Sequence, residues 1–111
     1  PLVSGAAIGW DPQIAVYDTR QPQAPCYACL FPPDAAHADV DCATMGVFAP
    51  LVGIVGSVQA AETLKLLAGT GQTLAGRLLM LDARCMQWDS LAIPRQPHCP
   101  VCGGRPAVQP E

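Results

Sequence analysis

The sequence is organised around the stretch DCATMGVFAPLVGIVGSVQAAETLKLL, residues 41–67. A lone cysteine, Cys42, stands at its beginning, and a long run of apolar residues follows. Pro50 fits the first turn of a helix, where its missing N–H costs little. Gly69 is a typical residue for ending one. We therefore expect one long helix that begins near residues 45–48 and ends before Gly69.

The two halves of this expected helix differ in pattern. Apolar residues of the first half point all round, which predicts full burial: Val47, Phe48, Leu51, Val52, Ile54, Val55 and Val58. In the second half an apolar arc that includes Leu64 and Leu67 opposes a polar arc that includes Glu62. Small residues at Gly53 and Gly56 permit close approach of a strand or of a partner subunit.

Four shorter segments have the composition of strands, namely residues 2–8, 13–18, 76–82 and 86–93. Short turns join the first two and the last two, so we expect two hairpins on either side of the helix. The predicted fold is α+β, with mostly antiparallel strands and the long helix packed on one face.

Composition excludes several classes of protein. The 111 residues suffice for one domain, and 50% hydrophobic against 14% charged residues argues against disorder. A net charge of −3 makes nucleic acid a poor candidate partner. The apolar run at residues 45–58 is too short to cross a bilayer, so no membrane is expected. The chain opens in a strand without an initiator Met, and we expect a fragment of a longer cytoplasmic protein.

Two Cys-x-x-Cys pairs, Cys26/Cys29 and Cys99/Cys102, flank the helix. Two such pairs are typical of a four-thiolate zinc site, which has no open coordination position and is therefore structural. Gly103 and Gly104 would let the backbone curl and aim amides at sulfur. A thioredoxin-like redox pair is the main alternative, although neither pair is expected to open a helix after a strand. His98 is expected to be a solvated loop residue rather than a ligand.

The remaining cysteines differ in their surroundings. Cys42 precedes the helix, whose N-terminus stabilises a thiolate, so it is either a nucleophile or a cysteine of no consequence. Cys85 lies in a hairpin turn without a charged helper and is not expected to act.

The chain resembles the ThiF/MoeB/HesA family, the bacterial relatives of ubiquitin-activating enzymes, over residues 1–104. Five motifs in one order carry the resemblance: Pro1-Leu-Val-Ser-Gly-Ala-Ala, Pro25-Cys-Tyr-x-Cys-Leu-Phe-Pro, Cys42-x-x-x-Gly-Val, Gly53-Ile-Val-Gly-Ser-Val-Gln-Ala-x-Glu-x-x-Lys-Leu-Leu and Cys99-Pro-Val-Cys-Gly. The Gln87-Trp88 strand and the Cys-Pro-Val-Cys-Gly-Gly ending lean towards ThiF. Met45 departs from the smaller residue that relatives often have near Cys42.

The resemblance implies an adenylyltransferase that uses MgATP to activate the C-terminal Gly-Gly of a ubiquitin-like sulfur carrier, ThiS-like or MoaD-like. A persulfide donor then supplies sulfur for the thiocarboxylate used in thiamine or molybdopterin biosynthesis. It also implies a homodimer, a C-terminal half of a Rossmann-like fold, and zinc held by the two Cys-x-x-Cys pairs. Cys42 falls on the cysteine implicated in sulfur transfer in ThiF-like relatives, a position that not every relative requires.

The family's Gly-rich nucleotide loop has no counterpart in the sequence, so ATP binding is expected upstream and the fragment alone is expected to be inactive. Residues 1–104 would then form the zinc-binding and carrier-binding part, and residues 105–111 a tail. Gly5 and Ala6 are expected to line the path of the carrier's tail. The alternatives from other classes are a non-enzymatic zinc module that docks a partner and a thiol–disulfide oxidoreductase.

Overall fold

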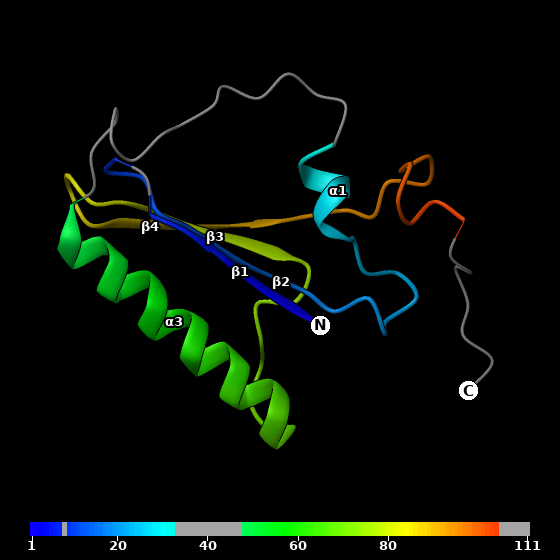
Figure 1. Ribbon diagram of the computed structural model, residues 1–111, viewed down its shortest axis with the longest axis horizontal. Helices are drawn as coiled ribbons and strands as arrows, with labels where there is room; N and C mark the ends of the chain where they lie inside the picture. The colour runs from blue at the N-terminus through cyan, green and yellow to red at the C-terminus, as the bar shows by residue number, and fades with distance from the viewer. Residues whose placement is uncertain (8, 33–47, 105–111) are drawn as a thin grey trace.

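A four-stranded antiparallel sheet with one long helix on one face forms the body of the protein (Figure 1). The computed structural model describes residues 1–7, 9–32 and 48–104. The strands are β1 (Leu2–Ala6), β2 (Gln13–Tyr17), β3 (Arg77–Asp82) and β4 (Gln87–Ala92), and the helices are α1 (Tyr27–Leu30) and α3 (Ala49–Ala68). The predicted α+β architecture is confirmed.

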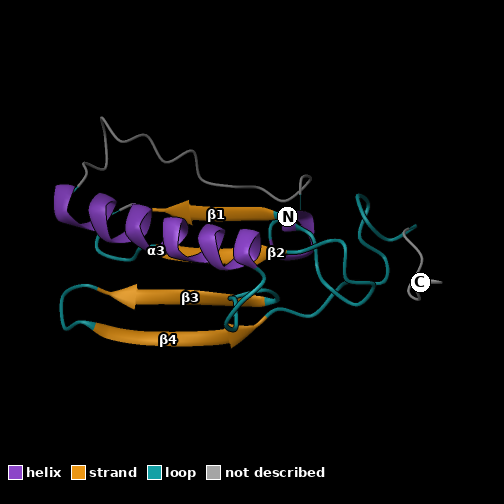
Figure 2. Cartoon of the chain, turned by 90° about the horizontal axis from the view of Figure 1, so that it is seen from below, coloured by secondary structure: helices purple, strands orange, loops and turns teal. Residues whose placement is uncertain are grey.

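The two predicted hairpins join edge to edge into a single sheet of order β1-β2-β3-β4. Leu2 pairs with Tyr17 in the first hairpin, and Leu78 pairs with Leu91 in the second. The central pairing of β2 with β3 places Ile14 opposite Leu79. Figure 2 shows the four strands side by side, with α3 lying along the β1–β2 side of the sheet.

The ends of α3 follow the signals in the sequence. Pro50 lies in the first turn, where a helix has no use for its N–H. Gly69 adopts the left-handed conformation, with φ 65° and ψ 35°, and its N–H donates to the carbonyl of Lys65 at 2.9 Å. Both predictions about the ends of the helix are confirmed.

The contact between α3 and β1 depends on the absence of a side chain at Gly5. Leu51 and Val55 are buried on the inner side of α3. A Cβ atom added at Gly5 would lie 2.6 Å from Cγ1 of Val55 and 2.6 Å from Cδ of Gln59. The amide of Gln59 also donates to the carbonyl of Val3 at 3.4 Å. The close approach at Gly5 is therefore made by α3 of the same chain, and this packing by itself accounts for a glycine there.

The prediction of which side of α3 is buried was wrong in both halves. Glu62, expected on the polar arc, is only 5% exposed. Leu64 and Leu67, expected on the buried arc, are 65% and 81% exposed. In the first half Val52 is half exposed, so that half is not buried all round.

Hydrogen bonds to the loop after α3 explain the burial of Glu62. One oxygen of its carboxylate accepts the backbone N–H of Leu74 at 2.6 Å, and the other pairs with Nζ of Lys65 at 2.5 Å. Lys65 also donates to the carbonyl of Gln72 at 2.7 Å. These bonds fix the connection from α3 to β3 and turn a polar side of the helix inward.

Helix α3, with 20 residues, is longer than the apolar run at residues 45–58 that was expected to be too short to cross a bilayer. By length and composition its 20 residues, which include an 18-residue stretch with a mean hydropathy of 1.4, would suffice to cross a membrane, so the expectation of too short a segment does not hold for the helix. In the structure α3 lies against β1 and β2.

We expect Gly5→Val to destabilise the fold by about 1–3 kcal/mol, because the new side chain meets Val55 in a well-packed contact. Gly53 is the matched control, since an added Cβ there meets nothing within 4 Å. Gly53→Ala should raise stability by about 0.5–1 kcal/mol through helix propensity. Urea unfolding followed by circular dichroism measures both, and unchanged stability of Gly5→Val would contradict the contact.

Candidate metal centre

The sheet brings the two Cys-x-x-Cys pairs to the same end of the molecule. Strands β2 and β4 are both antiparallel to β3, so they run in the same direction and their C-terminal ends lie together. The first knuckle, residues 26–29, follows β2 through the loop 18–25. The second knuckle, residues 99–102, follows β4 through the segment 94–98. Figure 1 shows α1 and the second knuckle beyond the same end of the sheet.

The four sulfur atoms form a compact buried cluster. The Sγ atoms of Cys26, Cys29, Cys99 and Cys102 all lie within 4.8 Å of one another. The distances are 3.9 Å for Cys26–Cys29, 3.6 Å for Cys26–Cys99 and 3.4 Å for Cys29–Cys102. A metal–sulfur bond of about 2.3 Å puts the ligands of a tetrahedral site about 3.8 Å apart. The cluster therefore has the size of a four-thiolate metal site.

In each knuckle two backbone N–H groups favour the thiolate of the first cysteine. In the first knuckle these are the N–H groups of Ala28 and Cys29, and the N–H of Cys29 also donates to the carbonyl of Cys26 at 3.0 Å. The sulfur of Cys99 receives the corresponding N–H groups in the second knuckle, from Val101 and Cys102. Amides directed at sulfur favour the thiolate, which is the form that binds metal.

The cluster needs a cation if all four thiols are to ionise. Hydrogen bonds from the N–H groups of Cys102 and Val101 lower the pKa of Cys99 to about 7. Burial, followed by contacts with the thiols of Cys102 and Cys99, raises the pKa of Cys26 to about 12. A negative charge on one sulfur therefore disfavours ionisation of the neighbouring thiols. A divalent cation among the sulfurs would offset this repulsion.

Further contacts connect the segment 94–98 to both knuckles. The backbone N–H of Gln96 donates to the sulfur of Cys29 at 3.4 Å. The guanidinium group of Arg95 donates to the carbonyls of Pro22 and Cys102, at 2.7 Å each. Neither Arg95 nor Gln96 was predicted to matter, because nothing in the sequence of the segment 94–98 distinguishes an arginine that bonds to the backbone from a solvated one.

Gly103 closes the second knuckle in a way that the sequence did not predict. Its N–H donates to the carbonyl oxygen of Cys99 at 2.8 Å, not to a sulfur atom. A Cβ atom at Gly103 would lie 2.5 Å from that oxygen and 2.9 Å from the carbonyl oxygen of Pro97. Gly104 has open space around it. Only Gly103 is therefore required by close packing.

The other candidate residues lie apart from the cluster or outside the described part. Cys42 and Met45 are outside the described residues. Cys85 is exposed in the β3–β4 turn, with its sulfur 3.9 Å from the carbonyl of Asp82. His98 is exposed and is not among the clustered ligands.

The expectation that neither cysteine pair opens a helix was wrong for the first pair. Cys26 is the N-cap of α1, which consists of a single turn of four residues. The sulfurs of this pair nevertheless approach those of the second knuckle more closely than each other. A metal centre explains these contacts between knuckles, whereas an isolated redox pair does not.

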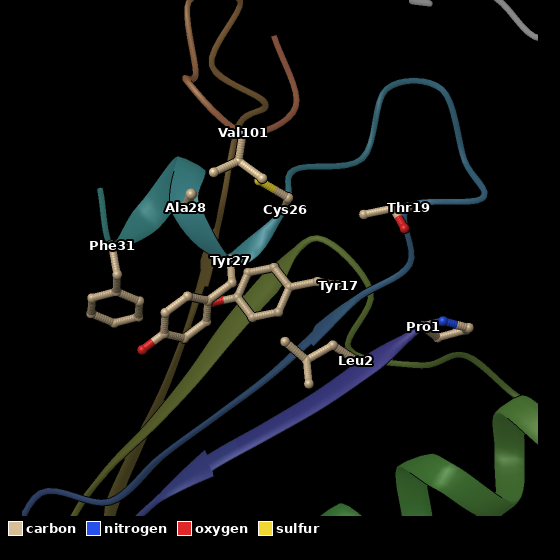
Figure 3. Close-up of a pocket in the computed structure, with 9 residues that line it drawn as sticks. All are labelled: Pro1, Leu2, Tyr17, Thr19, Cys26, Tyr27, Ala28, Phe31 and Val101. Carbon is tan, nitrogen blue, oxygen red and sulfur yellow. The ribbon is translucent and has the colours of Figure 1, made fainter. Parts of the chain in front are cut away.

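An apolar pocket of about 800 Å³ lies between the first knuckle and β1 (Figure 3). Its aromatic wall comes from Tyr17, Tyr27 and Phe31, with ring centroids 5.7 Å apart for Tyr17–Tyr27 and 5.0 Å for Tyr27–Phe31. Burial, with smaller effects from neighbouring groups, raises the pKa of Tyr17 to about 12. Cys26 also lines the pocket, so its shape depends on the geometry of the metal centre.

The sheet, the long helix and the four-cysteine centre define the class of protein, and the chain belongs to the ThiF family, whose sequence profile matches residues 1–101. The sulfur carrier protein adenylyltransferase of Thermus thermophilus is 46% identical over 110 residues, 96% of this chain and 41% of the relative. The molybdopterin-synthase adenylyltransferase of Escherichia coli is 46% identical over 103 residues, 93% of this chain and 41% of the relative.

A third relative, the sulfur carrier protein ThiS adenylyltransferase of Escherichia coli, is 43% identical and covers 94% of this chain and 40% of the relative. The chain thus spans less than half the length of these relatives. Because the identities are so similar, the leaning of the sequence towards ThiF over MoeB stays a prediction, and the choice between a ThiS-like and a MoaD-like carrier stays open.

The fold is also found in solved structures of MccB from Escherichia coli. One of them superposes with a TM-score of 0.70 at 15% identity, over 98% of this chain and 34% of the other. A structure of MccB with ATP gives a TM-score of 0.68 at 17% identity, over 91% of this chain and 32% of the other. At these identities the likeness shows the fold alone.

We expect Gly103→Ala to destabilise the chain by about 1–3 kcal/mol, because the methyl group would collide with two backbone carbonyls that cannot move aside. Gly104→Ala is the matched control and should change stability by less than about 0.5 kcal/mol. Thermal unfolding of the metal-loaded chain measures both. Equal stabilities for the two variants would show that the second knuckle is not closed as described.

Proposed function

We propose that this chain is the C-terminal part of an ATP-dependent adenylyltransferase that activates the C-terminal Gly-Gly of a ubiquitin-like sulfur carrier. The observation that carries the proposal is the match of 43–46% identity, over 93–96% of the chain, to three relatives named for this activity. The product, a carrier thiocarboxylate, would serve thiamine or molybdopterin biosynthesis. A persulfide donor and the carrier are the proposed partners, in the cytoplasm.

The described residues support a division of labour within a longer protein. They contain a sheet, a long helix and a metal centre, and the sequence has no Gly-x-Gly-x-x-Gly loop for ATP. We assign ATP and Mg²⁺ to a nucleotide-binding half before residue 1, residues 1–104 to the zinc-binding and carrier-binding part, and residues 105–111 to a tail.

Zinc is the metal that we propose for the centre. Four thiolates in a tetrahedral arrangement favour Zn²⁺, and all four cysteines are at most 9% exposed. With every position filled by sulfur, the ion has no room for water or substrate, so its role is to stabilise the fold and not to take part in the chemistry.

A homodimer is proposed on the basis of α3. Its outer side carries exposed apolar residues, among them Val52, Leu64 and Leu67. The only charged residues of the helix, Glu62 and Lys65, pair with each other. An uncharged helix side with small residues is suited to contact with another subunit.

Cys42 is the proposed sulfur-transfer residue. Its support is the family resemblance and its place in the sequence before the long apolar stretch. It lies outside the described residues, so the proposal rests on the sequence.

The zinc proposal predicts about one zinc per chain and only two thiols that react with a thiol reagent in the native, reduced protein. Cys42 and Cys85 are these two, because the other four of the six cysteines are ligands. Metal analysis and thiol titration before and after chelation measure both quantities. The oxidoreductase would be favoured instead if the native chain contained no zinc before chelation, had four or more reactive thiols, and exchanged them with a disulfide substrate.

The adenylation proposal predicts carrier-dependent exchange of pyrophosphate into ATP by the longer protein that carries this chain. The 111-residue chain alone should show none, because it lacks a nucleotide loop. A carrier without its terminal Gly-Gly is the control and should abolish the exchange. Carrier binding without exchange by the longer protein would favour the non-enzymatic docking module.

Cys42→Ala in the longer protein should leave pyrophosphate exchange unchanged but reduce formation of the carrier thiocarboxylate by at least about tenfold, the scale of losing one positioned group. Mass spectrometry of the carrier detects the thiocarboxylate. Cys85→Ala is the matched control and should have no effect on either step. Normal sulfur transfer in Cys42→Ala would remove Cys42 from the mechanism.

A further inference from the structure

The side chain of Arg95 connects the loop before the first knuckle with the second knuckle by bonds to two backbone carbonyls. Nη1 donates to the carbonyl of Pro22, in the loop that leads to the first knuckle. Nη2 donates to the carbonyl of Cys102, the last ligand of the second knuckle. Both distances are 2.7 Å, which is short for an N–H···O bond and typical of a charged donor.

The loop that Arg95 reaches is itself fixed. Arg20 donates to the carboxylate of Asp18 through Nε at 2.8 Å and Nη2 at 2.9 Å. The N–H of Gln21 donates to the carbonyl of Asp18 at 3.0 Å. Asp18 is only 6% exposed, so the start of the loop is anchored in the fold. A bond to Pro22 therefore ties Arg95 to an ordered segment.

The residue after Arg95 adds a bond to the cluster itself. The N–H of Gln96 donates to the sulfur of Cys29 at 3.4 Å. The two bonds of the Arg95 guanidinium group thus constrain the backbone of the segment 94–98, and this backbone positions the N–H of Gln96. Through Arg95 and Gln96, the segment after β4 contacts both knuckles with bonds that require no metal.

The charge of Arg95 suits a four-thiolate site. Four thiolates around a divalent ion carry a net negative charge, and a half-buried guanidinium beside them offsets part of it. Arginine keeps its charge, and its planar fork donates two bonds in fixed directions. Lysine could supply the charge but not both bonds at this geometry.

We propose that Arg95 is a positioning residue that holds the two knuckles at the spacing the metal requires before the metal binds. The proposal rests on the four-cysteine zinc site proposed above. Groups that orient metal ligands from outside the coordination shell typically change metal affinity 10–100-fold when removed. Arg95 bonds to the backbone of the ligand Cys102 and to the loop that leads to the ligand Cys26, and so it should belong to this group.

The test compares zinc binding by Arg95→Gln, Arg95→Lys and the parent chain in competition with a chromogenic chelator. We expect Arg95→Gln to weaken zinc affinity 10–100-fold and to release zinc faster from the folded, loaded chain. Arg95→Lys should fall between the two. Arg84→Gln is the matched control for charge, because Arg84 is exposed in the β3–β4 turn, and it should bind like the parent.

A second measurement separates positioning from general stability. A residue that only stabilises the fold would lower the unfolding temperature of the metal-free and zinc-loaded chains equally and leave zinc affinity unchanged. The Co²⁺-loaded chain gives a readout of ligand geometry, and its absorption bands should shift in Arg95→Gln but not in Arg84→Gln.

Zinc affinity and release within twofold of the parent in Arg95→Gln would overturn the proposal, as would an equal loss in Arg84→Gln. These results are distinct from a failure of the zinc site, in which the parent chain itself would bind no zinc.

Discussion

One end of the molecule depends on four sulfur atoms that lie within 4.8 Å of one another. They connect segments 73 residues apart, which the sheet brings together because β2 and β4 run in the same direction. The apolar core beside them is small, formed around Ala15, Tyr17, Leu78 and Ile93. A chain of this size buries a limited area, and a metal crosslink adds stability that such a core lacks. The aromatic pocket shares Cys26 with this cluster.

The position of α3 depends more on the space left by Gly5 and on the hydrogen bond from Leu74 to Glu62 than on the apolar pattern of the helix. Gly5 leaves room for Val55 and Gln59 to approach β1. Glu62 binds the backbone of the loop after the helix, which turns a charged residue inward. Other apolar residues of the helix, among them Val52, Leu64 and Leu67, are exposed. The same helix thus completes the sheet on one side and offers a surface on the other.

The sequence alone predicted what depends on local pattern. The four strands, the two hairpins, Pro50 in the first turn of α3, Gly69 at its end and the pairing of the two cysteine motifs all rest on residue types at fixed spacings. The orientation of α3 was wrong, because a helical wheel assumes that apolar residues turn inward and cannot anticipate the bond from Leu74 to Glu62. Gly103 was expected to serve the sulfurs, whereas its constraint comes from two carbonyls. Arg95 could not be singled out, since its partners lie in separate segments of the chain.

The distance between the knuckles along the chain has a consequence for the order of folding. Each knuckle alone supplies two thiolates, which is half of the ligand set, and the second knuckle is synthesised well after the first, since Cys26 and Cys99 are 73 residues apart. A metal ion would therefore be captured by all four sulfur atoms only after the second knuckle has been synthesised and the sheet has brought the two knuckles together. Contacts over such a long sequence separation form slowly, because loop closure must precede them. A metal ion bound by the four cysteines would then stabilise the fold after the sheet has assembled, and its binding would be a late step of maturation.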